Sequence, residues 1–225
     1  RYQYKEVADK KSKNNFLGTE LVLRSLDSGE EYSIPFVKEA SFDSTSSYLA
    51  YSVVDTNGSG NGIYYRDLSD EPSEQQAIAS EQDGLFANLS WDDYNHQLAF
   101  TQAAMDTTFE TDDAHVKVWN ASTANTETLV ESSATTDGWA LRTNNDLEWT
   151  DDGERLYFGL MTRDMVTVDQ KKEKEEQDSL DIYDRQQILS EKGVDVWHHD
   201  DPRIKPHQKE SWNQRKERTY RAVYH

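Results

Sequence analysis

Residues 91–100 read WDDYNHQLAF, and two other windows align with them without a gap, FDSTSSYLAY at residues 42–51 and WTDDGERLYF at residues 149–158. Each window has an aromatic residue, a polar turn, and an apolar run that ends in a second aromatic residue. This pattern is typical of a strand, a tight turn rich in Asp, and a second strand that is buried on both faces. The leading aromatic residues are 49 and 58 positions apart, so the chain repeats with a period of roughly 50 residues.

A second element, in which apolar and polar residues alternate, accompanies these windows. Alternation with a period of two predicts half-buried strands. Its copies read ELVLRSL at 20–26, GIYYRDL at 62–68, HVKVWNA at 115–121 and TYRAVYH at 219–225. Further short strands are predicted near Tyr32–Ile34 and Thr126–Val130. Four antiparallel strands at this period form one blade of a β-propeller.

The sequence therefore predicts an all-β fold, a β-propeller of four-stranded antiparallel blades, with about three blades present. We divide the chain into the end of one blade (1–35), two blades (36–84 and 85–135), and a last blade (140–225) with a long insertion at about 161–216. A propeller closes with about four or more blades, so we expect an incomplete ring and a longer parent polypeptide. The exposed strand edges of such a ring predict that the chain either self-associates or is the ordered portion of a larger polypeptide.

The charge of the chain is strongly negative and unevenly distributed. Lys and Arg number 24 and Asp and Glu number 43, which gives a net charge of −19. Residues 21–160 carry six basic and 26 acidic residues, a net charge of −20. This field disfavours nucleic acid as a partner, because affinity for nucleic acid comes largely from neutralised phosphates. It is consistent with a solvated surface adapted to salt, or with the steering of cationic ligands.

Several classes of chemistry are not indicated by the sequence. There is no cysteine, which excludes disulfides, thiolate nucleophiles and zinc–thiolate sites. The sequence contains no run of 18 apolar residues, so no membrane span is predicted. Gly58-Ser59-Gly60 is the nearest match to a nucleophile elbow, but its setting among Asn and Gly residues is typical of a hairpin turn. We therefore predict no catalytic residue and no cofactor in this chain.

The insertion in the last blade holds the candidate site residues. Long irregular segments in compact domains are usually functional or disordered. We take as substrate-facing candidates Trp197, His198, His199 and Asp201. A metal site is not expected, because adjacent histidines on an extended segment point to opposite sides. The alternative interpretation is structural, with Trp197 anchoring the insertion and Asp200 capping a turn before Pro202.

Four segments, taken in order, resemble the N-terminal propeller region of bacterial serine peptidases of the prolyl oligopeptidase family. They are GTELVLRSLDSGE at 18–30, WTDDGERLYFG at 149–159, VDVWHHDDPR at 194–203 and RTYRAVY at 218–224. The first two occur in many propellers, and the third is the most specific. From the first to the last, they span residues 18–224, which is nearly the whole chain.

The resemblance implies a C-terminal α/β-hydrolase domain, which would carry the Ser, Asp and His of the active site. It implies that the propeller covers this active site, admits peptide substrates, and lies in the periplasm or is secreted. Dipeptidyl peptidases of the family hold the substrate amino terminus with a Glu pair on a propeller insertion. Glu175 and Glu176 are an adjacent pair inside the insertion, but they lie in a charged run.

Two other functions fit the same predicted fold. The first is a non-enzymatic propeller scaffold that binds a protein partner through its loops. The second is a carbohydrate-processing propeller enzyme, which would need carboxylates that converge at the central channel. A hydrolase domain encoded downstream of residue 225 would favour the peptidase, and its absence from the gene would favour the scaffold.

Overall fold

The computed structural model describes residues 17–26, 28–68, 74–106, 111–143, 146–163 and 219–225. Their regular structure is dominated by antiparallel β-sheet, with a short 3-10 turn at Ser132–Ala134. No helix among these residues is long and apolar enough to span a membrane. The candidate residues Trp197, His198, His199 and Asp201, and the pair Glu175 and Glu176, lie outside the described residues.

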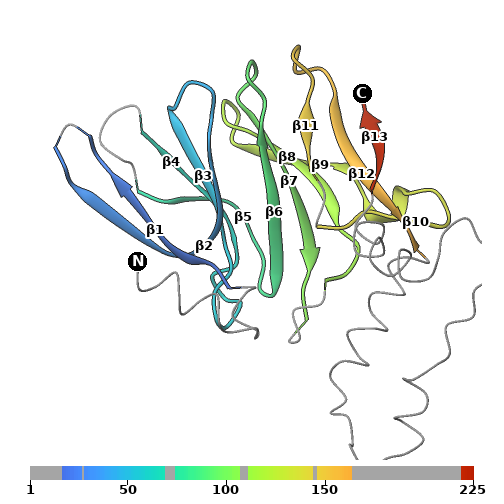
Figure 1. The fold of residues 1–225 in the computed structure, drawn as a ribbon, viewed down its shortest axis with the longest axis horizontal. Helices are drawn as coiled ribbons and strands as arrows, with labels where there is room; N and C mark the ends of the chain where they lie inside the picture. Colours follow the sequence, from blue (N-terminus) through green and yellow to red (C-terminus); the bar gives the residue numbers. More distant parts are fainter. Residues whose placement is uncertain (1–16, 27, 69–73, 107–110, 144–145, 164–218) are drawn as a thin grey trace, which may run out of the picture. The chain divides into compact units, whose positions relative to one another are not determined.

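The strands form three antiparallel sheets that succeed one another along the chain (Figure 1). The first sheet has the order β1-β2-β3-β4-β5, with bounds Thr19–Arg24, Glu31–Phe42, Tyr48–Val53, Gly62–Asp67 and Gln76–Ser80. The second has the order β6-β7-β8-β9, with bounds Gly84–Trp91, Gln97–Ala104, His115–Asn120 and Asn125–Val130. The third contains β10, β11, β12 and β13, with bounds Trp139–Ala140, Glu148–Trp149, Leu156–Thr162 and Tyr220–Tyr224. These sheets are blades of a β-propeller, and the described residues do not close its ring.

In the first two sheets, the strand after the polar turn is the most apolar strand and lies inside the sheet. β3 pairs with β2 and β4, and β7 pairs with β6 and β8. Most of their side chains are buried on both faces, including Tyr51, Leu98 and Phe100, which are fully inaccessible to solvent. A strand buried on both faces needs a continuous apolar run, and this explains the repeated sequence windows.

The second strand, β2, changes its neighbour within its length. Its first part pairs with β1, as in Leu21 opposite Ile34, and its second part pairs with β3, as in Phe42 opposite Leu49. Phe36 lies between these parts with a φ of 58°, in the left-handed region that few non-glycine residues adopt. β2 therefore continues through position 36 and joins β1 and β3 in one hydrogen-bonded sheet.

Apolar side chains join the sheets face to face. Ala50 and Ile63 of the first sheet pack with Phe86, Phe100 and Trp119 of the second. On the opposite face of the second sheet, a further cluster combines it with the third and contains Ala99, Ala103, Val116, Val118, Leu141, Leu147, Leu156 and Phe158. Burial of this apolar area is the main force that holds successive sheets together.

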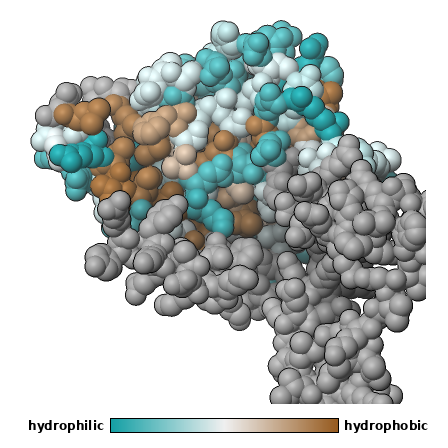
Figure 2. All heavy atoms as spheres, viewed as in Figure 1, coloured by the Kyte–Doolittle hydropathy of each residue, from teal (hydrophilic) through white to brown (hydrophobic). Residues whose placement is uncertain are grey.

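The first sheet has a third apolar cluster of its own, formed by Ile34, Val37, Leu49, Tyr51 and Val53. Figure 2, in the view of Figure 1, shows apolar residues in brown on the left of the molecule, where Figure 1 places this sheet. Val22 and Leu26, in and just after β1, are 52% and 97% exposed. Apolar surface therefore remains accessible at this sheet.

Polar contacts between the first two sheets involve residues next to the repeated windows. The Trp91 indole Nε1–H donates to the carbonyl oxygen of Ser41 at 3.2 Å. Both oxygens of the Glu39 carboxylate accept backbone N–H groups in β6, from Asn88 at 2.7 Å and from Leu89 at 2.9 Å. These N–H groups lie at a bulge in β6 and receive their acceptor from the neighbouring blade.

Aspartates buried in the polar turns explain why the turn residues recur. Asp92 is 1% exposed, and its carboxylate accepts the backbone N–H groups of Tyr94 and Asn95 at 2.8 and 3.2 Å. Asp43 is 3% exposed and accepts the N–H of Tyr48 at 2.8 Å. A buried carboxylate needs such donors to offset the loss of hydration.

The contacts of the chain divide it into two compact units. One comprises Arg1–Leu160 with Tyr220–His225, and the other comprises Met161–Thr219. Only residues 161–163 and 219 of the second unit are described. The insertion expected at about 161–216 therefore falls almost wholly outside the described residues.

Candidate functional site

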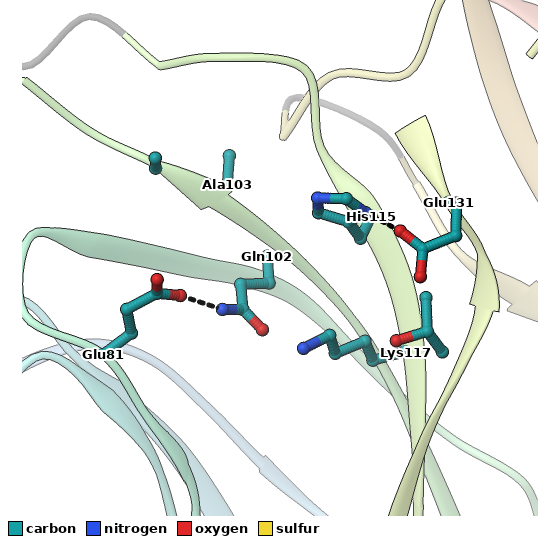
Figure 3. Close-up of a pocket in the computed structure, with 8 residues that line it drawn as sticks. Glu81, Gln102, Ala103, His115, Lys117 and Glu131 are labelled. Carbon is teal, nitrogen blue, oxygen red and sulfur yellow. Dashed lines mark hydrogen bonds and ion pairs between the residues drawn. The ribbon is translucent and has the colours of Figure 1, made fainter. Parts of the chain in front are cut away.

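A pocket with polar and charged walls opens on the second sheet, with a volume of about 180 Å³ (Figure 3). Its lining is formed by Glu81, Gln102, Ala103, Ala104, His115, Lys117, Thr128 and Glu131. They come from β7, β8, β9, and the segments after β5 and β9. The pocket thus gathers residues that are up to 50 positions apart in the sequence.

Strand pairing places the central polar side chains on one face of the sheet. Gln102 of β7 lies opposite His115 of β8, and Lys117 lies opposite Phe100. Because side chains alternate between the two faces of a strand, Gln102, His115 and Lys117 share the face of Phe100 and Trp119. That face packs on the first sheet, so the pocket lies at the edge of this apolar core, where the neighbouring side chains are polar.

Two acidic side chains of the pocket are held by neighbours. The Gln102 Nε2 group donates to the carboxylate of Glu81, as Figure 3 shows. The His115 Nδ1 atom lies 2.8 Å from the carboxylate of Glu131. The same Nδ1 is 3.3 Å from the backbone N of Ser132. Nδ1 therefore lies between the Glu131 carboxylate and a backbone N–H donor.

Two polar groups of the pocket lack a hydrogen-bond partner among the described residues. The Lys117 ammonium makes no hydrogen bond or ion pair there, and in Figure 3 it points into the space between Gln102 and His115. The Gln102 Oε1 atom is buried and has no donor. Buried polar atoms without partners are uncommon in folded proteins, so these two groups mark the pocket as a place where polar ligand groups fit.

The pocket contains no pairing of a nucleophile with a base in the part of the chain that is described. Its hydroxyl comes from Thr128, and no base among these residues is hydrogen-bonded to that hydroxyl. Among the same residues, no group of three or more His, Asp or Glu side chains is arranged to hold a metal ion. The arrangement therefore fits recognition by hydrogen bonds and charge.

The Ser59 segment is a turn between paired strands. β3 and β4 form an antiparallel hairpin around it, and the Asp55 carboxylate accepts the backbone N–H groups of Asn57 and Gly60 at 3.1 and 2.8 Å. Ser59 itself is exposed. This geometry confirms the interpretation of Gly58-Ser59-Gly60 as a hairpin turn.

Sequence reasoning missed the pocket, although part of its signal was present. The alternating run HVKVW at 115–119 places His115 and Lys117 on one face. Glu81 belongs to the end of another sheet, and its approach to Gln102 depends on how the two sheets pack. No local spacing in the sequence encodes that approach.

Similarity of this chain to known proteins is found among solved structures. No family model matches it, and no curated protein matches it. Two similar solved structures are an oligogalacturonate lyase in complex with manganese (TM-score 0.42, 10% identity, 64% of this chain and 39% of that chain) and TolB from Acinetobacter baumannii (TM-score 0.40, 14% identity, 62% of this chain and 31% of that chain). The chain spans about a third to two fifths of the length of these proteins.

Proposed function

We propose that these blades are the substrate-gating propeller of a bacterial serine peptidase of the prolyl oligopeptidase family, periplasmic or secreted. The support comes from the four sequence segments that resemble the family, together with the propeller blades that the described residues form. In this proposal a hydrolase domain of the parent polypeptide supplies the catalytic residues. The present chain forms part of the wall of the passage through which peptides reach the active site.

The observation that carries a gating role is the concentration of negative charge in the blades. Residues 21–160 have a net charge of −20. Acidic side chains exposed on the second and third sheets and their turns include Asp93, Glu127 and Glu154. A passage walled by one sign of charge concentrates ligands of the opposite sign. The gate would therefore favour peptides with basic residues and disfavour acidic ones.

Peptide cleavage by the full-length parent polypeptide tests this function. Fluorogenic peptides that differ only in two flanking residues, both Lys or both Glu, are compared at low and high salt. We expect kcat/KM for the Lys peptide to exceed that for the Glu peptide about tenfold or more at low salt, and the ratio to shrink as salt screens the field. Neutralising Asp93, Glu127 and Glu154 together should reduce the ratio.

Two results would count against the proposal in different ways. Equal cleavage of both peptides at low salt would remove the electrostatic gate. Failure of the full-length protein to react with a serine-directed phosphonate probe would remove the peptidase assignment and favour a scaffold. The exposed apolar side chains of Val22 and Leu26 are the observation that favours this second function, since such residues are suited to binding a protein partner.

A further inference from the structure

We propose that the pocket on the second sheet binds a small zwitterion, namely a free α-amino acid with a short side chain. This inference goes beyond a peptidase gate and does not depend on it. It rests on the charges, the unpaired groups and the size of the pocket.

The charges of the lining alternate across the pocket, with Lys117 between Glu81 and Glu131 in Figure 3. Glu81 and Glu131 are each held in place by a neighbour, the first by the Gln102 amide and the second by the His115 imidazole. Lys117 carries a positive charge with no partner among the described residues. Because His115 already contacts the Glu131 carboxylate, Glu81 and Lys117 are the two opposite charges left for a ligand. A simple anion would be repelled by Glu81, and a simple cation would be repelled by Lys117. A molecule that carries both charges is matched on both sides.

The unpaired groups assign the two ends of such a ligand. Its carboxylate accepts hydrogen bonds from the Lys117 ammonium, which points into the pocket in Figure 3. Its ammonium group lies toward the Glu81 carboxylate and brings an N–H donor to Gln102 Oε1, which lacks one. The ligand would therefore supply partners for the Lys117 ammonium and for Gln102 Oε1, which have none among the described residues.

The volume limits the size of the ligand. Pockets for drug-sized molecules are larger, at about 300 Å³ or more. The pocket thus accommodates glycine, alanine or valine better than an aromatic amino acid.

Calorimetric or NMR titration of the 225-residue chain tests the proposal. We expect saturable binding of alanine with a Kd of about 1 mM or tighter. Acetate and ethylamine, which carry one charge each, should bind at least about tenfold more weakly, and tryptophan should bind more weakly than alanine. Because no peptidase activity is measured, the result is independent of the proposed function.

Matched variants locate the binding. Lys117→Met keeps an apolar stem and removes the positive charge, and Glu81→Gln removes the carboxylate next to Gln102; each should weaken alanine binding about tenfold or more. Lys117→Arg keeps the charge and should retain most of the affinity. Arg24→Gln removes an exposed positive charge on the first sheet and should leave the Kd unchanged. Thermal unfolding of each variant verifies that it is folded.

Three outcomes would overturn the proposal. One is the absence of saturation by glycine, alanine and valine at ~10 mM. A second is alanine binding that is equal in the wild type and in folded Lys117→Met. A third is acetate binding as tight as that of alanine, which would identify a simple anion site.

Discussion

The indole N–H of Trp149 donates a hydrogen bond to the backbone carbonyl of Ser90 across 3.1 Å. Trp91 makes the same bond to Ser41, one blade earlier, at 3.2 Å. In each case the aromatic residue that ends the strand before the polar turn is tied to the equivalent strand of the preceding blade. The first window has Phe42 at this position, which has no indole N–H group and is 52% exposed. The repeated tryptophan thus has a physical role in joining blades.

Replacing Trp149 with Phe should destabilise the fold by about 1–2 kcal/mol more than a change of ring size alone, because the Ser90 carbonyl loses its donor. Urea unfolding followed by circular dichroism measures this difference. Trp139→Phe is the matched control, since the Trp139 ring packs on Tyr220 at 5.1 Å and its indole N–H has no bond among the described residues. Equal losses in the two variants would show that the hydrogen bond contributes nothing.

The predicted fold rests on features that lie close together in the sequence. The windows at 42–51, 91–100 and 149–158 each become a strand, a turn and a buried strand, because apolar runs and Asp-rich turns act locally. An all-β propeller of antiparallel blades is therefore accessible from sequence. The continuity of β2 through Phe36 could not be predicted from the sequence, because a positive φ at an aromatic residue has no sequence signal of its own.

The candidate site was less accessible for a different reason. Sequence reasoning selected Trp197, His198, His199 and Asp201 because of their residue types, and these lie outside the described residues. The pocket instead depends on Glu81, Gln102 and Lys117, which are common residue types brought together by strand register and by the packing of two sheets. Their role is encoded in long-range contacts, which a single sequence does not display.

Asp43 makes the stability of the first turn depend on acid pH. Burial alone would raise the pKa of its carboxyl. Hydrogen bonds from the Thr45 hydroxyl and from three backbone N–H groups outweigh this effect and leave the pKa below its ordinary value. The three N–H groups are those of Tyr48, Thr45 and Ser47. A group with a lowered pKa in the folded state stabilises the fold above the unfolded pKa, about 3.9 for Asp. This contribution is lost as pH falls through the folded pKa.

Acid unfolding of Asp43→Asn tests the linkage. The unfolding free energy of the wild type should decrease as pH falls below about 4, and this decrease should be smaller in Asp43→Asn. Thr45→Val removes one donor and brings the folded pKa of Asp43 closer to the unfolded value, so its loss of stability in acid should be smaller than that of the wild type. Identical pH slopes for wild type and Asp43→Asn would contradict the role assigned to this carboxylate.

Gly153 lies in the turn of the third window and against the turn of the second. Its φ is +67°, and a Cβ atom placed there would lie 2.6 Å from the Asp92 Oδ1 atom and 2.8 Å from the Asn95 Nδ2 atom. Gly153→Ala should therefore suffer both backbone strain and a clash between sheets, about 2–3 kcal/mol in total. Gly29→Ala and Gly138→Ala are matched controls, because these glycines also have positive φ but no atom within 4 Å of the added Cβ.

The controls should lose about 1 kcal/mol, which is the strain alone. Chemical unfolding of the three variants gives the difference directly. If Gly153→Ala is no less stable than Gly29→Ala, the two turns are not in the tight contact that the structure shows.

The exposed apolar side chains of the sheets predict that the chain associates with itself. Val22 and Leu26 are exposed at the first sheet, and Val223 and Tyr224 are each 40% exposed in the third. Unpaired strand edges with apolar side chains favour pairing with another chain, but the net charge of −19 opposes the approach of two copies. Salt shortens the range of this repulsion, to about 8 Å at physiological ionic strength.

Association should therefore increase with ionic strength, which light scattering coupled to gel filtration measures between about 0.05 and 1 M salt. Val22→Lys combined with Leu26→Lys places charge on the exposed edge and should shift the chain toward monomer at every salt concentration. Glu20→Lys is a control that alters the charge of the same strand without removing an apolar side chain. A 26.0 kDa monomer that unfolds cooperatively at high salt would show that the edges are not adhesive.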